Sequence, residues 1–199
     1  MKFKPAVIIL IPMMVALNLV LGAIVATLKL PIFLDSVGII LTGILAGPWA
    51  AALVGVATTL LGSLIVNPMY WAFSGTAIMI GLTAGSLAEH GFFRRRHLLP
   101  FIGATLLAGL VITVVSALVS APVKAFVFGG VTASGSDALV VLFRRSGNSV
   151  LVSVLKGQFL SELADKLIAT ALAAFLAQSL SGRTLTWFPG STQRIRSAA

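Results

Sequence analysis

The sequence predicts an all-α membrane protein with six transmembrane helices. Hydrophobic residues make up 58% of the 199 residues, charged residues only 10%, and the mean hydropathy is +1.09. Soluble globular domains usually contain about 25% charged residues, so this composition excludes that class. Because six spans of about 20 residues use most of the chain, we expect a single integral membrane domain over residues 1–199.

Pro, Gly, Asn and basic residues divide the chain into six apolar stretches. The expected spans cover residues 5–28, 32–46, 48–66, 71–88, 98–121 and 151–180. The first run is too long for the apolar region of a signal peptide. The second, at about 1.5 Å per residue, reaches only about 22 Å, against a hydrocarbon core of about 30 Å. Gly47-Pro48 makes the tight turn before the third span, and Asn67-Pro68 lies in the turn before the fourth.

Basic residues give the orientation. Lys2 and Lys4 precede the first span, the run Arg94–Arg96 precedes the fifth, and arginines follow the sixth. Six crossings place all three groups on one side, so we expect the N-terminus and C-terminus in the cytoplasm. If residues 32–66 formed one long span or a re-entrant hairpin, Arg94–Arg96 would lie on the opposite side from the N-terminus.

The segment 122–150 is then a long outer loop between helices 5 and 6. Its Gly and Ser residues predict turns, and Ser136 is placed to cap a short helix over 137–145. A loop of this length with its own helix often covers a site.

Several classes of function are excluded. The net charge of +9 comes from residues that flank apolar stretches, so we expect no nucleic-acid partner. The chain has no cysteine, and both histidines, His90 and His97, lie in the connection before the fifth span. It also contains no HExxH motif and no phosphate-binding loop. We therefore expect no enzyme and no metal or cofactor site in this chain.

The sixth span carries the most informative polar residues. Gln158, Glu162 and Asp165 share one helix face, and Glu162 can pair with Lys166 at i, i+4. An ionisable residue in mid-membrane costs about 2.5–3.5 kcal/mol on insertion scales and usually faces protein or water. Two interpretations fit: a polar wall of a binding site, or a salt bridge that locks this helix to its neighbours. We expect Gln158 and Glu162 to bind substrate, while Asp165 and Lys166 lie deeper and hold the packing.

Five other polar or aromatic residues are candidates near the outer ends. Asn67, Tyr70 and Trp71 suit a planar ligand, although an interfacial aromatic belt also explains the two aromatic residues. Lys124 suits an anionic group, or it snorkels to the interface. Asp35 is expected to cap the second span.

Small residues spaced four apart predict close helix packing, within the chain or against another membrane subunit. Examples are Gly43 with Gly47 and Gly81 with Gly85.

The stretch Leu34-Asp35-Ser36-Val37-Gly38-Ile39-Ile40-Leu41-Thr42-Gly43-Ile44-Leu45-Ala46-Gly47-Pro48-Trp49-Ala50-Ala51-Ala52-Leu53-Val54-Gly55, followed by Asn67-Pro68, resembles the substrate-binding S components of energy-coupling factor (ECF) transporters. The size, the six spans and Asp165-Lys166 in the last helix are also similar. The resemblance implies a subunit of a prokaryotic plasma membrane that captures a vitamin-like molecule near the outer face. Its partners would be a transmembrane coupling (T) subunit and two cytoplasmic ATPase (A) subunits, which use the ATP.

One feature departs from the family pattern. An Ala-xxx-Ala motif in the first helix typically contacts the coupling subunit, and Gly22-xxx-Ala26 is the nearest substitute here.

The leading hypothesis is therefore the S component of an ECF importer, with a thiamine-, pyridoxine- or riboflavin-type ligand. The alternative is a self-sufficient ion-coupled transporter or channel in which Glu162, Asp165 and Lys166 form a relay. A membrane scaffold without a ligand is a third hypothesis.

Overall fold

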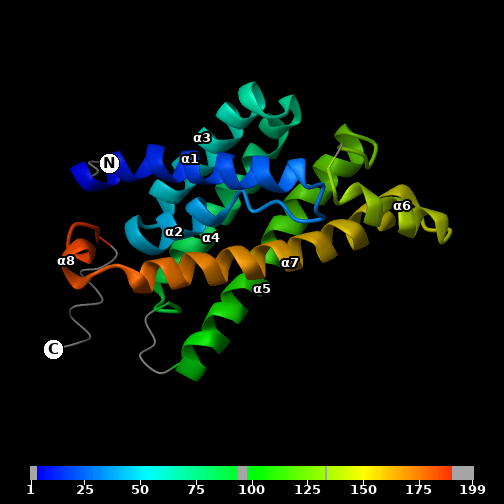
Figure 1. The fold of residues 1–199 in the computed structure, drawn as a ribbon. Coiled ribbons are helices and arrows are strands. Elements are labelled where there is room, and N and C mark those ends of the chain that lie inside the picture. Colours follow the sequence, from blue (N-terminus) through cyan, green and yellow to red (C-terminus); the bar gives the residue numbers. More distant parts are fainter. Residues whose placement is uncertain (1–3, 94–97, 133, 190–199) are drawn as a thin grey trace.

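The structure, a computed structural model, describes residues 4–93, 98–132 and 134–189, and within these ranges it is built from helices without a strand (Figure 1). The elements in chain order are α1 (Pro5–Thr27), α2 (Val37–Ala46), α3 (Pro48–Ile65), the 3-10 helix η1 (Pro68–Phe73), α4 (Ser74–Glu89), α5 (Leu98–Pro122), the π-helical turn η2 (Val123–Val127), α6 (Asp137–Arg145), α7 (Val150–Ser179) and α8 (Gly182–Leu185). Most of the basic residues that determine the predicted orientation, including Lys2 and Arg94–Arg96, lie outside the described residues.

Four stretches are long and apolar enough to cross a membrane: Pro5–Thr27, Pro48–Ile65, Pro68–Glu89 and Leu98–Val127. The helix α7 has 30 residues and is therefore about 45 Å long, more than a hydrocarbon core requires, but it carries four charged side chains. The helix α2 has only 10 residues. The all-helical membrane architecture is thus confirmed, while the six-span count and the orientation stay predictions.

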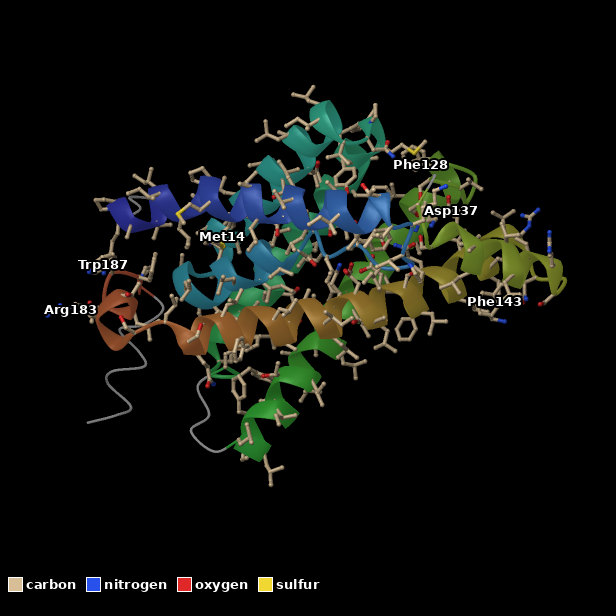
Figure 2. All side chains as sticks on the ribbon, viewed as in Figure 1. Met14, Phe128, Asp137, Phe143, Arg183 and Trp187 are labelled. Atoms are coloured by element: carbon tan, nitrogen blue, oxygen red, sulfur yellow. The ribbon has the colours of Figure 1, made fainter. Side chains whose placement is uncertain are left out.

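Large apolar side chains project outward from the long helices (Figure 2). Leu99 on α5 and Leu64 on α3 are 83% and 82% exposed, and similar residues lie along α1. Exposed apolar surface on this scale marks a lipid or protein contact rather than a water-facing surface.

The short helix α2 lies inside the molecule, in contact with α1, α3, α4 and α7. Every residue from Val37 to Leu45 is buried. A helix that is apolar on all sides packs within protein, which explains why α2 does not need the length of a lipid-facing span. The predicted start at residue 32 was wrong, because residues 32–36 belong to the linker between α1 and α2.

The fourth expected span, residues 71–88, falls within the apolar stretch Pro68–Glu89, which consists of two helical elements. Residues 68–73 form η1, and α4 begins at Ser74. The Asn67 side chain accepts a hydrogen bond from the Met69 N–H at 2.9 Å, and Pro68 occupies the first helical position. Together they begin a tighter helix before the apolar run of α4.

Glycines hold α2, α3 and α4 at short distances, in a region that we call the closely packed half. A Cβ atom on Gly81 would lie 2.6 Å from the Ala51 carbonyl carbon, and one on Gly43 would lie 2.8 Å from the Gly85 backbone nitrogen. These small residues therefore serve contacts within the chain, as the spacing predicted.

The opposite half, which we call the cavity end, gathers the end of α1, the end of α3, η1, the start of α4, the end of α5 and the first half of α7. The helix α6 lies beside α7 there, while α8 lies at the other end of α7, near the start of α1 (Figure 1). In Figure 2, Asp137 and Phe128 mark the cavity end, and Arg183 and Trp187 mark the other.

Candidate functional site

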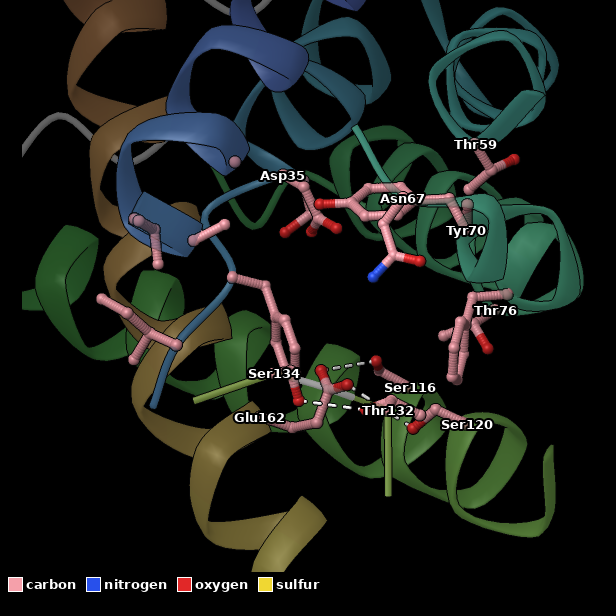
Figure 3. A pocket seen from close by; sticks show the side chains of 18 of the residues that line it. Asp35, Thr59, Asn67, Tyr70, Thr76, Ser116, Ser120, Thr132, Ser134 and Glu162 are labelled. Carbon is pink, nitrogen blue, oxygen red and sulfur yellow. Dashed lines mark hydrogen bonds between the residues drawn. The ribbon is translucent and has the colours of Figure 1, made fainter. Parts of the chain in front are cut away.

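A cavity of about 590 Å³ opens between the helices at the cavity end (Figure 3). Its walls come from α1, the α1–α2 linker, α2, α3, η1, α4, α5, the segment before α6, and α7. Small-molecule sites usually have volumes of about 300–1,000 Å³, so the cavity has the size of such a site.

The polar wall of the cavity centres on Glu162 of α7, which is only 4% exposed. Its Oε2 atom accepts a hydrogen bond from Ser116 Oγ at 2.7 Å, and its Oε1 atom accepts one from Gln158 Nε2 at 3.0 Å. Lys166 Nζ lies 3.1 Å from Oε2, which is the ion pair that the i, i+4 spacing predicted. Glu162 and Lys166 both line the cavity, and Figure 3 shows Glu162 directed at Ser116 and Ser120 of α5.

Asp165 holds the α1–α2 linker in place. Its Oδ1 atom accepts hydrogen bonds from the backbone N–H of Phe33 at 3.0 Å and of Leu34 at 2.6 Å, and its Oδ2 atom pairs with Lys166. Leu34 and Lys29 have positive φ angles of 50° and 53°. Such angles cost a non-glycine residue about 1–3 kcal/mol, so the linker needs an external anchor, and Asp165 supplies it.

The structure contradicts the expected capping role of Asp35. A residue of α1 supplies the hydrogen-bond acceptor for the first turn of α2, because Asn18 Oδ1 accepts a hydrogen bond from the Gly38 N–H at 2.7 Å. Asn18 also donates to Thr58 Oγ1 at 3.1 Å and so ties three helices together. The residue at the N-cap position is Ser36, and its side chain makes no capping bond.

Asp35 instead lines the cavity. Within the described ranges its side chain makes no ion pair and no hydrogen bond with another residue, and Figure 3 shows the carboxyl group directed into the open space. Burial raises the pKa of Asp35 to about 6; Lys166 opposes this rise, while Asp165 and Glu162 add to it.

The three candidates Asn67, Tyr70 and Trp71 differ in their position relative to the cavity. Asn67 and Tyr70 line the cavity, and the Tyr70 hydroxyl lies 3.4 Å from where a Cβ on Gly22 would be. Trp71 does not line the cavity, and its side chain is 62% exposed. Adjacent residues on a 3-10 helix point in directions about 120° apart, so of the two aromatic residues the structure brings Tyr70, and not Trp71, to the site.

Lys124 lines the cavity but already has an anionic partner. Its Nζ atom lies 2.8 Å from Asp137 Oδ1 and donates to Ser136 Oγ at 2.7 Å. Burial tends to raise the pKa of Asp137, but the hydrogen bond and charge of Lys124 outweigh it and lower that pKa. The helix 137–145 has the predicted bounds, but the Ser136 side chain does not cap it. That side chain instead accepts a hydrogen bond from Lys124.

Several lining residues were not predicted from the sequence. Ser116 and Ser120 of α5 are buried and bind Glu162, at 2.7 and 3.5 Å respectively. Their i, i+4 spacing in an apolar span was the signal that could have identified them. Three buried lining atoms have no hydrogen-bond partner: Ser36 Oγ, Thr76 Oγ1 and Gln158 Oε1.

No group of three or more metal-binding side chains occurs among the residues that the structure describes. The donors in the cavity are instead spread over several helices, an arrangement suited to an organic molecule.

The model of the family "ECF transporter, substrate-specific component" matches residues 6–181. The chain belongs to this family. ECF S components are membrane-embedded transport subunits that act with a transmembrane T subunit and ATPases, and this chain has an S-subunit role in ECF-type uptake. Neither curated proteins nor solved structures gave a significant match.

In this S component, the two residues of Gly22-xxx-Ala26 differ in exposure, and Ala26 is exposed. Gly22 is buried, with Asp35 Cβ 3.4 Å from the position of an added Cβ atom, and both Gly22 and Ala26 line the cavity. The pair therefore contributes to the cavity wall.

Proposed function

We propose that this S component captures a vitamin or related micronutrient in the cavity and delivers it with a T subunit and two ATPases. The chain would cross a prokaryotic plasma membrane six times, with α2 and α7 as the second and sixth spans and both termini in the cytoplasm. The cavity end then faces outward. The chain performs no catalysis and binds no cofactor, and ATP is used by the partners.

The unpaired polar atoms of the cavity carry this proposal. A buried polar group without a partner costs about 1–3 kcal/mol, and Ser36 Oγ, Thr76 Oγ1 and Gln158 Oε1 are three such groups around one space. A ligand with hydrogen-bonding groups would satisfy them together.

The surroundings of the polar wall disfavour the relay hypothesis. Asp165 accepts hydrogen bonds from the N–H groups of Phe33 and Leu34. Glu162 accepts hydrogen bonds from serine and glutamine side chains. Beyond Lys166, residues 167–180 contain no ionisable side chain, and Ala169, Ala173 and Ala177 are fully buried. A proton or cation would therefore have no path along α7 toward the closely packed half.

Native mass spectrometry of the purified protein, followed by titration with vitamins and their precursors, tests the proposal. We expect binding at micromolar concentration or tighter. Glu162→Gln should weaken binding at least tenfold, which corresponds to about 1.4 kcal/mol. Trp71→Ala is the control, because Trp71 is exposed and outside the cavity.

Failure of every compound to bind would contradict the proposal. Ion flux in liposomes that contain this chain alone, abolished by Glu162→Gln, would support the relay instead.

A further inference from the structure

The charges around the cavity do not balance. We define the acid cluster as Asp35, Glu162, Asp165 and Lys166, in which Lys166 contacts the carboxylates of Glu162 and Asp165. Three carboxylates and one ammonium leave two negative charges when all four groups are ionised. Of the three acids, Asp35 has neither an ion pair nor a side-chain hydrogen bond with another residue within the described ranges, and it faces the open space.

The other lysines at the cavity do not correct this imbalance. Lys124 is 1% exposed and is held by Asp137 at 2.8 Å, so that pair is neutral as a unit. Lys29 is exposed at the rim and has no recorded ion pair. Its charge is hydrated, and hydrated charges interact weakly with a buried group.

Aromatic side chains share the cavity with Asp35. Phe33, Tyr70 and Phe73 line the same cavity, and Tyr70 lies beside Asp35 in Figure 3. The faces of aromatic rings attract cations, more strongly where water is excluded. A carboxylate together with aromatic rings is a suitable environment for an organic cation and a poor one for an anion.

We propose that the ligand of this S component is an organic cation, whose charged group lies against Asp35 among these aromatic rings. The inference rests on the proposed function and narrows its substrate class. Gln158 Oε1, an acceptor without a partner, calls for an N–H or O–H donor on the same ligand. The arrangement also replaces the earlier interpretation of Lys124 as the partner of an anionic tail.

Two matched pairs of probes test the charge requirement. In each pair one member is a permanent cation and the other is a neutral compound of similar shape: 1-methylnicotinamide with nicotinamide, and thiamine with 3-deazathiamine. Binding is measured by isothermal titration on the full chain in detergent or nanodiscs. Native mass spectrometry of the freshly purified protein gives the mass, and hence the identity, of any ligand that co-purifies.

We expect a co-purified ligand to be cationic, or the cation of at least one pair to bind at least tenfold more tightly than its neutral partner. In Asp35→Asn this preference should fall to about threefold or less, since the amide keeps the shape and loses the charge. Glu89→Gln is the matched control, because Glu89 ends α4 about 20 Å along the helix from Thr76. The control should keep the full preference.

The outcomes separate the two proposals. A neutral or anionic co-purified ligand, equal binding within each pair, or an unchanged preference in a folded Asp35→Asn variant would overturn the cation inference and leave the uptake role intact. If no ligand co-purifies, and neither the probes nor a wider vitamin panel binds, both the inference and the proposed function fail.

Discussion

Two buried lysines at the cavity end show how differently the same charge can be used. Lys124 and Lys166 are 1% and 2% exposed, and both line the cavity. Lys124 meets one carboxylate, Asp137, in a segment close to it in the chain. Lys166 contacts two carboxylates, and Asp35 adds a third acid nearby. Equal burial therefore produces a neutral pair in one place and an excess of negative charge in the other.

The comparison indicates which region is available to a ligand. A buried ion pair that is complete offers little to a third charge, because both partners are already desolvated and bonded. A cluster with surplus carboxylate gains from an added cation. The Lys124 pair is accordingly the closed part of the cavity wall, and the acid cluster is the region where we propose that the ligand binds.

Removal of Lys166 should have the largest effect. Lys166→Met leaves three acids without their common cation, and loss of one partner of a buried pair usually costs about 3–5 kcal/mol. We expect a large fall in Tm or loss of the monodisperse peak, measured by fluorescence-detected size exclusion after heating. Lys156→Met is the control, because Lys156 lies on the same helix with its side chain exposed. Equal behaviour of the two variants would show that the acid cluster does not need Lys166.

A second substitution sharpens the same contrast. Asp35→Asn should partly restore the Tm of Lys166→Met, because it removes one surplus acid. The same change should not restore Lys124→Met, whose partner Asp137 belongs to the other region. The comparison of the two double variants by thermal unfolding gives the test, and equal rescue in both would mean that the two regions are not separate.

Removal of Lys124 should have a smaller effect than removal of Lys166. Asp137 is 13% exposed and keeps the N–H groups of Thr132 and Ser134 as donors, so it can be rehydrated when Lys124 is lost. We expect Lys124→Met to cost about 1–3 kcal/mol. A double-mutant cycle with Asp137→Asn, read as changes in Tm, measures the coupling. No coupling would show that the observed ion pair contributes nothing to stability.

The smallest expected effect is on pH dependence. The pKa of Asp35 rises from its ordinary value of 3.8 to about 6, in an environment that includes Glu162, Asp165, Lys166 and Tyr70. Between pH 7 and pH 5 the folded chain therefore takes up a proton more readily than the unfolded chain, so the ligand-free protein should become more stable. Binding of a permanent cation should weaken over the same range, because the carboxylate becomes neutral.

Thermal unfolding and titration at pH 7 and pH 5 check both directions. Asp35→Asn should remove both trends, which separates them from the titration of other groups. A wild-type affinity for the cation that does not change with pH would argue against contact between the cation and Asp35.

Much of the fold could be predicted from local chemistry. Gly47-Pro48 separates α2 from α3, and apolar runs mark the limits of α1, α5 and α7 within one or two residues. The polar face of α7 was visible because helical spacing places Gln158 and Glu162 together.

The remaining features depend on partners that helical spacing does not connect. The start of α2 is satisfied by Asn18, 20 residues earlier, so the local Asp35-Ser36 pair gave a false capping signal. The partner of Lys124 is Asp137, in a segment that no periodic pattern connects to α5. Helical spacing does not reveal such contacts. For that reason the sequence suggested an anion site at Lys124, where the structure has an ion pair with Asp137.

The anchor of the α1–α2 linker has a consequence for biogenesis. The N–H groups of Phe33 and Leu34 gain their hydrogen-bond acceptor only when Asp165 has been translated, 132 and 131 residues later. The α1–α2 linker, which forms part of the cavity wall, is therefore fixed only after the last long helix has been synthesised. A ribosome-bound chain that ends before α7 would have its early helices inserted and still lack a formed site.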